Sequence, residues 1–171
     1  MDSTALRELQ APLKEKYRDQ PQTAVITLRA KGDLAEGAIA CKVETGRALV
    51  EAGLHPATGG SGLEACSGDM LLEALVACAG VTLKAVATAL EFRLAGGSVK
   101  AEGDLDFRGT LGVDRAAPVG FRAIRLAFEL DTDEPQDRID TLLKLTQRYC
   151  VVLQTLRSPP EIAASISHRA A

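Results

Sequence analysis

The sequence has few of the groups on which metal and nucleotide sites are usually built. It contains two histidines, His55 and His168, which lie far apart in the chain. Its four cysteines form no CxxC pair, and neither GxGxxG nor a P-loop motif is present. Since structural zinc needs Cys and His at short spacing, these absences argue against zinc, a thioredoxin-like motif and a bound nucleotide. We expect no metal and no cofactor.

A strong charge of either sign is also absent. The chain has 20 Lys and Arg against 23 Asp and Glu, a net charge of −3, and no basic cluster. This balance argues against nucleic acid and anionic membrane surfaces as partners. The N-terminal stretch lacks an apolar signal-peptide core, and the uncharged stretch between Glu73 and Lys84 is too short to span a bilayer. The expected location is therefore the cytoplasm.

Aromatic residues are scarce, at 4% of the chain, and tryptophan is missing. The core must therefore be built from Leu, Val, Ile and Ala. With 171 residues, 46% of them hydrophobic, the chain is long enough for one domain with a real core. We expect residues 1–20 to form an N-terminal helical extension and residues 21–171 to form a single domain.

The order of the hydrophobic patterns predicts an α+β fold with antiparallel sheets. Runs of strands precede and follow long helices, which is typical of α+β rather than doubly wound proteins. Ser67 and Asp133 are the expected N-caps of the two long helical segments. The expected strands cover residues 23–32, 36–45, 47–53, 98–112, 121–133 and 161–170, and the expected helices cover residues 3–17, 68–94 and 134–158.

The helix expected over residues 68–94 is the most apolar part of the chain. Its sequence "LLEALVACAGVTLKAVA", from Leu71 to Ala87, is hydrophobic on nearly every side. At 1.5 Å per residue such a helix is roughly 40 Å long, more than a small sheet can wrap. Large exposed apolar surfaces mark interfaces, so a second copy of the chain is the expected cover.

The four cysteines differ in their sequence contexts. Cys41 lies in a strand pattern, Cys66 in the Gly- and Ser-rich loop, Cys78 in the long helix and Cys150 in the second helical segment. Each could be an ordinary core or idle thiol, because free Cys is among the most buried residue types. Cys66, near the start of the long helix, could also compete with Cys150 for a disulfide partner.

A reactive Cys78 needs a lowered pKa. It lies about ten residues into its helix, where the dipole of the helix N-terminus has little effect. A cation from elsewhere in the sequence would therefore have to approach the thiol. Arg47, Arg148 and Arg157 are the candidates, and each could instead be a solvated surface arginine.

Two segments of the chain resemble one redox family. The segment "GDMLLEALVACAGVTL" follows a Gly-rich loop, and "YCVVLQTL" carries a second cysteine in a later helix. Together with the strands "GTLG…VGFRAIRLAFEL", they resemble the OsmC/Ohr family of osmotically inducible and organic hydroperoxide resistance proteins. The resemblance covers roughly residues 23–170. It implies antiparallel sheets packed on a long central buried helix, in an intertwined homodimer with sites at the subunit interface.

The resemblance also implies an activity, the thiol-dependent reduction of organic hydroperoxides or hydrogen peroxide. Cys78 would be the peroxidatic thiolate, Cys150 the resolving thiol and Arg47 the activating arginine. A dithiol of the lipoyl or thioredoxin type would regenerate the enzyme. Gly68 stands where the family has a glutamate, with Asp69 one position later, and this difference predicts a divergent branch.

Substrate contacts are expected near the start of the long helix. The candidate pocket residues are His55, Leu71, Leu75 and Asp69, with Leu72 and Val76 extending the apolar wall. An apolar wall favours organic, fatty-acid-like peroxides over hydrogen peroxide. The alternative is a non-enzymatic dimeric protein on the same scaffold, which would bind an apolar ligand there while its cysteines are structural.

Overall fold

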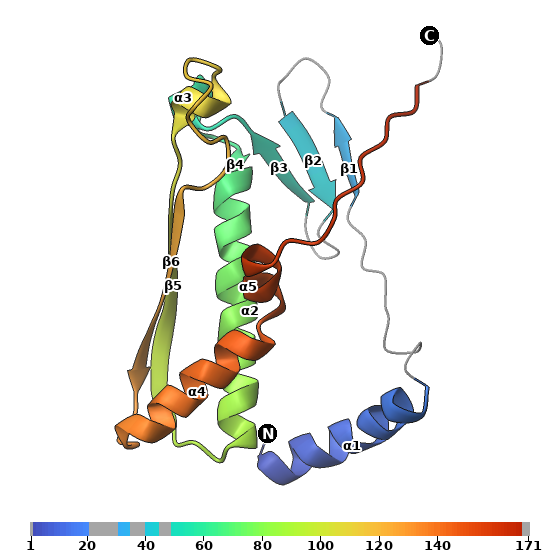
Figure 1. The fold of residues 1–171 in the computed structure, drawn as a ribbon, viewed down its shortest axis with the longest axis vertical. Coiled ribbons are helices and arrows are strands. Elements are labelled where there is room, and N and C mark those ends of the chain that lie inside the picture. Colours follow the sequence, from blue (N-terminus) through green and yellow to red (C-terminus); the bar gives the residue numbers. More distant parts are fainter. Residues whose placement is uncertain (1, 21–30, 35–39, 45–48, 169–171) are drawn as a thin grey trace.

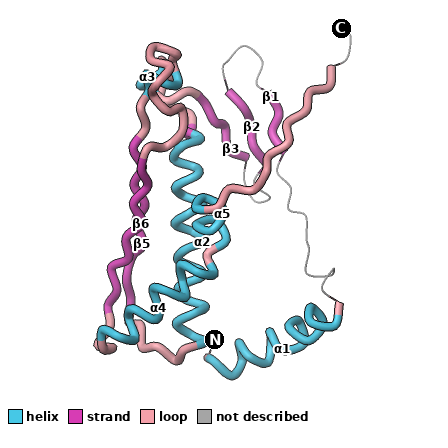
Figure 2. The backbone as a smooth tube through the Cα atoms, viewed as in Figure 1, coloured by secondary structure: helices cyan, strands magenta, loops and turns pink. Residues whose placement is uncertain are grey.

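The computed structural model describes residues 2–20, 31–34, 40–44 and 49–168 of the chain (Figure 1). Its elements form an α+β fold in which one long helix lies between a four-stranded sheet and a two-stranded ribbon. The predicted fold class is confirmed. Figure 2 shows the same order of layers by element type, with α4 (Gln136–Tyr149) and α5 (Val151–Arg157) beside the central helix α2 (Ser67–Ala89).

The first sheet contains the predicted antiparallel meander. Strands β1 (Lys31–Leu34), β2 (Ala40–Glu44) and β3 (Leu49–Gly53) pair in sequence order, with Val43 opposite Val50 in the centre of the β2–β3 pair. A short strand β4 (Ala65–Cys66) adds to β3 in parallel, so this sheet is not purely antiparallel as expected. Most of the strand expected over residues 23–32 lies outside the described residues.

The long helix α2 (Ser67–Ala89) begins one residue before its predicted start, but it ends at Ala89 rather than at the predicted Leu94. Its N-cap is Cys66 rather than Ser67, and Asp69 lies in its first turn. It ends before Gly96, because Leu90 forms the C-cap and Glu91 takes a left-handed φ of 51° that turns the chain away. Its buried stripe, at successive spacings of four residues, consists of Leu75, Ala79, Leu83 and Ala87.

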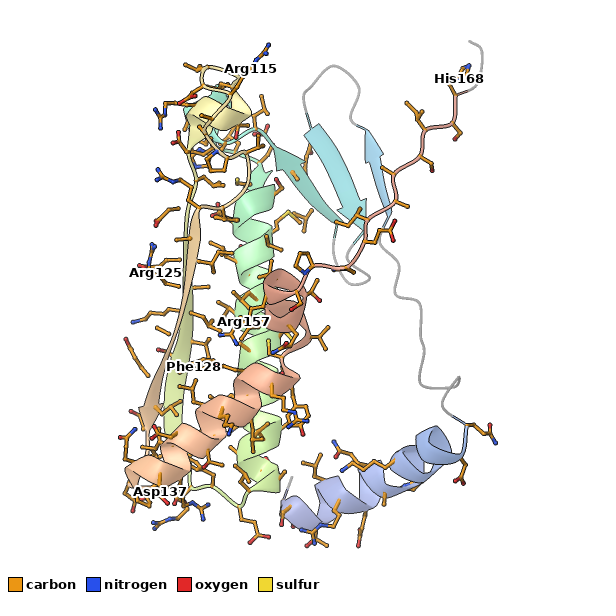
Figure 3. All side chains as sticks on the ribbon, in the orientation of Figure 1. Arg115, Arg125, Phe128, Asp137, Arg157 and His168 are labelled. Carbon is orange, nitrogen blue, oxygen red and sulfur yellow. The ribbon has the colours of Figure 1, made fainter. Side chains whose placement is uncertain are left out.

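The ribbon of β5 (Gly96–Asp104) and β6 (Ala123–Asp131) packs one face on this helix. Its residues alternate between exposed and partly buried positions, as the period of a half-buried strand requires. Figure 3 shows Arg125 pointing away from the helices and Phe128 pointing towards them. The short helix α3 (Phe107–Thr110) interrupts the connection between the two strands.

The second helical segment is broken in two, which the sequence pattern did not predict. Helix α4 (Gln136–Tyr149) and helix α5 (Val151–Arg157) meet at Cys150, whose ψ of 106° is extended. The β-branched pair Val151–Val152 follows the break and favours helix less than its neighbours do. The N-cap of α4 is Pro135, so the predicted cap Asp133 is wrong.

The predicted last strand is also wrong within the described residues. Residues 159–168 form no strand there, and the side chains of Ile162 and Ile166 are exposed. The alternating pattern of this segment is real, but a strand needs a neighbour that supplies backbone hydrogen bonds. At the other end of the chain, α1 (Ser3–Asp19) begins beside the C-terminal end of α2, where Ser3 Oγ donates to Glu91 Oε1 over 2.8 Å, and extends away from it (Figure 1).

One buried carboxylate ties the start of α4 to the turn after α2. Glu134 has a side chain only 6% exposed and accepts the backbone N–H of Arg93 at 2.9 Å. The guanidinium of Arg138 lies 2.8 Å from its other oxygen, one helical turn further on. These contacts of Glu134 hold the turn after α2 against the start of α4, and so set where the two helices cross.

By length and composition, α2 is long and apolar enough to cross a membrane, contrary to the expectation from the stretch between Glu73 and Lys84. The core helix of a soluble protein meets the same criterion. Leu75 and Leu83 are almost fully buried in the two hydrophobic clusters that join α2 to the ribbon and to α4 and α5. This packing is that of a core helix.

Candidate functional site

Two cysteines from distant parts of the chain meet beside the middle of α2. The sulfur atoms of Cys78 and Cys150 lie 3.4 Å apart, and the Cys150 thiol donates a hydrogen bond to the Cys78 sulfur. Cys150 is fully buried, whereas Cys78 is partly exposed. Both thiols are free. The contact brings together Cys78 and Cys150, the two cysteines that the resemblance to one redox family predicts to act as a pair.

The helix packing explains how the two residues meet. Leu142, Thr146 and Cys150 follow one another at spacings of four residues and are all buried, so they form the stripe of α4 that faces the core. Cys150 remains in the last helical hydrogen bond, from its N–H to the carbonyl of Thr146 at 3.0 Å. Its side chain is therefore positioned by α4, while its extended ψ sends the chain into α5.

The break at Cys150 creates free hydrogen-bond donors next to the sulfurs. The first N–H groups of a helix have no partner within it. In α5, the amides of Val151 and Val152 act to lower the pKa of Cys78, and those of Val152 and Leu153 act to lower that of Cys150. A continuous helix would have kept these amides in its own ladder.

The Cys78 thiol is the more acidic of the two. Burial alone would raise the pKa of Cys78, but hydrogen bonds outweigh it and hold this pKa below its usual value. The donors are the amide of Val152, the thiol of Cys150, the hydroxyl of Thr82 and the amide of Val151. A donor lowers a pKa by stabilising the charged form. The site therefore favours a thiolate at Cys78.

The pKa of Cys150 is shifted in the opposite direction. Burial raises the pKa of its thiol, and its hydrogen bond to Cys78 and the charge of the Cys78 sulfur raise it further. The amides of Leu153 and Val152 act against this rise without cancelling it. Of the two thiols, Cys78 therefore ionises more readily, and the Cys150 thiol is the hydrogen-bond donor.

None of the groups that shift the pKa of Cys78 is a cation of the described residues. The guanidinium of Arg148 lies over the ring of Tyr149, 5.6 Å from its centre. Arg157 contacts the side-chain oxygen of Gln147 at 3.4 Å. Arg47 lies outside the described residues. In the single chain, neither Arg148 nor Arg157 is among the groups that shift the pKa of Cys78, where backbone amides and uncharged side chains act instead.

A cleft of about 370 Å³ lies beside the hydrophobic cluster that contains Cys150, although neither Cys78 nor Cys150 lines it. Leu75, a predicted pocket residue, forms part of its wall together with residues of β6 and α5 that also pack around Cys150. Two arginines line the cleft as well, and Figure 3 shows Arg157 on α5 beside α2. The lining residues are Leu75, Phe121, Arg122, Ala123, Ile124, Leu126, Phe128, Gln147, Leu153, Leu156 and Arg157.

The other predicted pocket residues lie away from this cleft. His55 caps the short 3-10 helix η2 (Pro56–Thr58) by accepting the N–H of Ala57 on Nδ1, and its ring stacks on Phe107 at 4.9 Å. Leu71 and Asp69 lie on the exposed side of the first turns of α2. None of the three lines the 370 Å³ cleft.

Around Gly68 the environment is apolar. A Cβ atom at this position would lie 3.5 Å from the side chains of both Leu105 and Phe121 and 3.6 Å from the sulfur of Cys66. A methyl group fits there, but a carboxylate would meet hydrocarbon without a partner among these three groups. The apolar surroundings of residue 68 therefore suit a glycine and do not suit a carboxylate side chain.

Sequence reasoning missed several groups that shape the site. Thr82 follows Cys78 by one helical turn, a spacing that places both on one face of α2. The amides of Val151 and Val152 could be inferred only from the helix break, for which the Val-Val pair after Cys150 is a weak signal. Phe121, which lines the cleft, was assigned only to a strand.

A model of the OsmC-like protein family matches residues 60–165, more than half of the chain. The chain belongs to the OsmC family. The match includes both cysteines of the dithiol, the whole of α2 and the ribbon. Comparison with curated proteins gives no match.

Solved OsmC structures share the fold at low sequence identity. An OsmC-like protein from Mycoplasma pneumoniae is 17% identical with a TM-score of 0.64, over 78% of this chain and 89% of that one. An organic hydroperoxide resistance protein OsmC from Legionella pneumophila is 19% identical with a TM-score of 0.60, over 78% and 91%. The organic hydroperoxide resistance protein OhrB of Bacillus subtilis is 16% identical with a TM-score of 0.55, over 77% and 93%.

Proposed function

We propose that this protein is a thiol peroxidase that reduces organic hydroperoxides, with Cys78 as the peroxidatic and Cys150 as the resolving cysteine. The observation that carries the proposal is the contact of their sulfurs at 3.4 Å, with the pKa of Cys78 lowered and that of Cys150 raised. A thiolate is the nucleophile in peroxide reduction. The family includes proteins named for organic hydroperoxide resistance, which supports the same chemistry.

In the first step, the Cys78 thiolate attacks one oxygen of the hydroperoxide. A sulfur–oxygen bond forms, the O–O bond breaks, and the leaving alkoxide takes a proton to become an alcohol. Cys78 is oxidised to a sulfenic acid and the peroxide is reduced. Because Cys78 is partly exposed and Cys150 is buried, the peroxide meets Cys78 first.

In the second step, Cys150 attacks the sulfur of the Cys78 sulfenic acid. The S–S bond forms, the S–O bond breaks, and the oxygen leaves as water with the proton of the Cys150 thiol. The two sulfurs need to close from 3.4 Å to a bond of about 2.05 Å, a small movement. A small dithiol, of the lipoyl or thioredoxin type, then reduces the disulfide by exchange.

The cleft supports an organic rather than an inorganic substrate. Its walls are mainly hydrocarbon side chains, including Leu75, Leu153 and Leu156, which favour an apolar substituent. The positive charges of Arg122 and Arg157 in the lining suit a polar or anionic end of the same molecule. Fatty-acid-like hydroperoxides combine these two features.

The proposal includes a homodimer in the cytoplasm. One face of α2 is exposed in the single chain although it is apolar, and Val81 on that face is 72% exposed. Burying such a face against a second copy removes apolar surface from water. Arg47 of either copy stays a candidate contributor to the site.

The proposal is tested by titration of the reduced protein with one equivalent of cumene hydroperoxide. Free thiols are then counted, and disulfides are mapped by mass spectrometry. We expect loss of two thiols per chain and a Cys78–Cys150 bridge that does not form in Cys78→Ser. Cys66→Ser is the matched control, because Cys66 is also a partly buried free thiol but lies outside the contact.

The same experiment distinguishes the enzyme from an apolar-ligand binding protein on the same scaffold. Four unreacted thiols after treatment would overturn the peroxidase and favour the binding protein. A bridge that includes Cys66 in place of Cys150 would also contradict the proposed resolving role.

A further inference from the structure

One polar group of the core lacks a partner among the described residues. The hydroxyl oxygen of Thr146 makes no hydrogen bond there, although the residue is only 1% exposed. Among the fully buried large side chains of the described residues, which are Leu75, Leu142, Thr146 and Cys150, it is the one with a hydroxyl group. Buried hydroxyls are satisfied in most folded proteins, so this one requires an explanation.

Packing alone does not explain a threonine at this position. A valine has nearly the same shape and would fill the stripe of α4 without burying an unpaired hydroxyl, which costs free energy. In the structure as it stands, the hydroxyl oxygen of Thr146 therefore makes no hydrogen bond that would stabilise the fold. A group that is idle in one state of a site can be used in another.

The position of Thr146 points to the dithiol. Thr146 lies one helical turn before Cys150 on the buried stripe, and its carbonyl accepts the Cys150 N–H at 3.0 Å. Side chains at this spacing are neighbours, and helical side chains lean towards the N-terminus, so that of Cys150 leans over Thr146. Threonine uses two χ1 rotamers in helices, so its hydroxyl can turn towards the sulfur.

The Cys150 sulfur offers this hydroxyl a good acceptor only when it loses its proton. In the resting site the Cys150 thiol donates to Cys78 at 3.4 Å, and a neutral thiol is a weak acceptor. During resolution Cys150 must attack as a thiolate while buried from water. A buried anion without sufficient donors is costly, and hydrogen bonds to charged groups are the strong ones.

We infer that the hydroxyl of Thr146 donates to the sulfur of Cys150 as that thiol ionises, and so promotes closure of the disulfide. This inference rests on the proposed peroxidase function for its biological role. The bond changes are those of the resolving step: the S–S bond forms, the S–O bond breaks, and water leaves with the Cys150 proton. Thr146 keeps its own proton throughout.

The first test follows both steps after mixing with cumene hydroperoxide. Dimedone traps the Cys78 sulfenic acid, and mass spectrometry measures sulfenic acid, sulfinic acid and disulfide against time. In Thr146→Val we expect sulfenic acid to form at the wild-type rate but the disulfide to close roughly tenfold more slowly, with more sulfinic acid, because one hydrogen bond to a charged sulfur is lost. Thr146→Ser, which keeps the hydroxyl, should restore closure.

The matched control is Thr141→Val, on the exposed side of the same helix, whose hydroxyl bonds to the carbonyl of Asp137 at 2.8 Å. It should close at the wild-type rate. Thermal unfolding of Thr146→Val should occur at or above the wild-type temperature, because an unpaired buried hydroxyl is removed. Wild-type closure in Thr146→Val, or slow closure in Thr146→Ser, would overturn the inference.

A second test needs no peroxide, so it separates this inference from the proposed function. In a Cys41→Ser, Cys66→Ser background, Ellman's reagent places a mixed disulfide on Cys78. This exchange releases one coloured thionitrobenzoate, and attack by Cys150 on the Cys78 sulfur then forms the Cys78–Cys150 disulfide and releases a second. Release of the second should be roughly tenfold slower in Thr146→Val. Equal release rates would overturn the role of Thr146, whereas a wild type inert to peroxide would overturn only the peroxidase.

Discussion

At the scale of single residues, two chemically identical side chains are given opposite properties. The amides of Val151 and Val152 and the hydroxyl of Thr82 stabilise a negative sulfur at Cys78. Cys150 is fully buried, and burial raises the pKa of its thiol. Under the proposed function, these opposite shifts suit one cysteine to be the nucleophile and the other to be the resolving thiol across one contact of 3.4 Å, without a cation among the described residues that shift the pKa of Cys78.

The Thr82 hydroxyl provides a direct test of this arrangement. Thr82→Val removes one donor to the Cys78 sulfur, so the pKa of Cys78 should rise. Alkylation of Cys78 by iodoacetamide near neutral pH should then slow several-fold, and its pH profile should move to higher pH. The measurement is the pH dependence of the alkylation rate, resolved by site through mass spectrometry.

Thr88→Val is the control for that substitution. Thr88 lies on the same helix, and its hydroxyl bonds to the carbonyl of Lys84 at 2.8 Å, away from the dithiol. Its profile should match that of the wild type. An unchanged profile in Thr82→Val would contradict a role for Thr82 and leave the amides of α5 and the Cys150 thiol as the groups that lower the pKa of Cys78.

At the scale of secondary-structure elements, the packing around the start of α2 determines the position of one wall of the cleft. The ring of Phe121, just before β6, covers Gly103 of β5, where an added Cβ would overlap the ring. The same ring lies at ordinary contact distance from an added Cβ at Gly68. Phe121 also lines the cleft, so these glycines set the position of one cleft wall.

The two glycines should therefore respond in opposite ways to alanine. Gly103→Ala should destabilise the protein by roughly 1–3 kcal/mol, because the ring and the strand must shift apart. Gly68→Ala should stabilise it by roughly 0.5–1 kcal/mol, because alanine loses less backbone entropy in a helix and its methyl group fits. Urea unfolding followed by far-ultraviolet circular dichroism measures both.

These two substitutions serve as controls for each other, since both add one methyl group near Phe121. Equal effects on the free energy of unfolding would contradict the packing described here. Gly103→Ala should also slow peroxide reduction if the cleft wall contributes to substrate binding.

At the scale of the whole molecule, the single chain leaves an apolar helix face uncovered. The buried stripe of α2 faces the ribbon, α4 and α5, while Ala74, Ala77, Val81 and Ala85 remain exposed on the other side. The small side chains on this face allow two helices to approach closely. A dimer around paired α2 helices would enclose the helix as its composition requires.

A charged side chain introduced on this face of α2 tests whether the face forms a dimer interface. Val81 is 72% exposed in the single chain, and Val81→Glu would bury an uncompensated carboxylate in the expected interface. Association should weaken by roughly 3–5 kcal/mol, more than a hundredfold in Kd. Sedimentation velocity should show a wild-type dimer and a monomeric variant.

Val113→Glu is the matched control, because Val113 is 73% exposed but lies in the connection between α3 and β6. It should leave the dimer intact. A monomeric wild type, or a dimer that survives Val81→Glu, would contradict the expected interface.

The sequence by itself determined the elements that depend on local patterns. Alternation predicted the β2–β3 and β5–β6 pairs, and uniform apolarity predicted the long helix, because these periods follow from backbone geometry. It also selected Cys78 and Cys150 through resemblance to a family that the comparisons confirm. Arg47 stays a prediction, since it lies outside the described residues.

Only the tertiary structure decided how the site works. The break at Cys150 depends on an extended ψ that no residue type at that position requires, yet it frees the amides that stabilise the Cys78 thiolate. The unpaired hydroxyl of Thr146 likewise becomes visible only when its surroundings are known. Burial and hydrogen bonding depend on neighbours distant in the chain, so the sequence selects the two candidate cysteines but does not determine the direction in which the pKa of each is shifted.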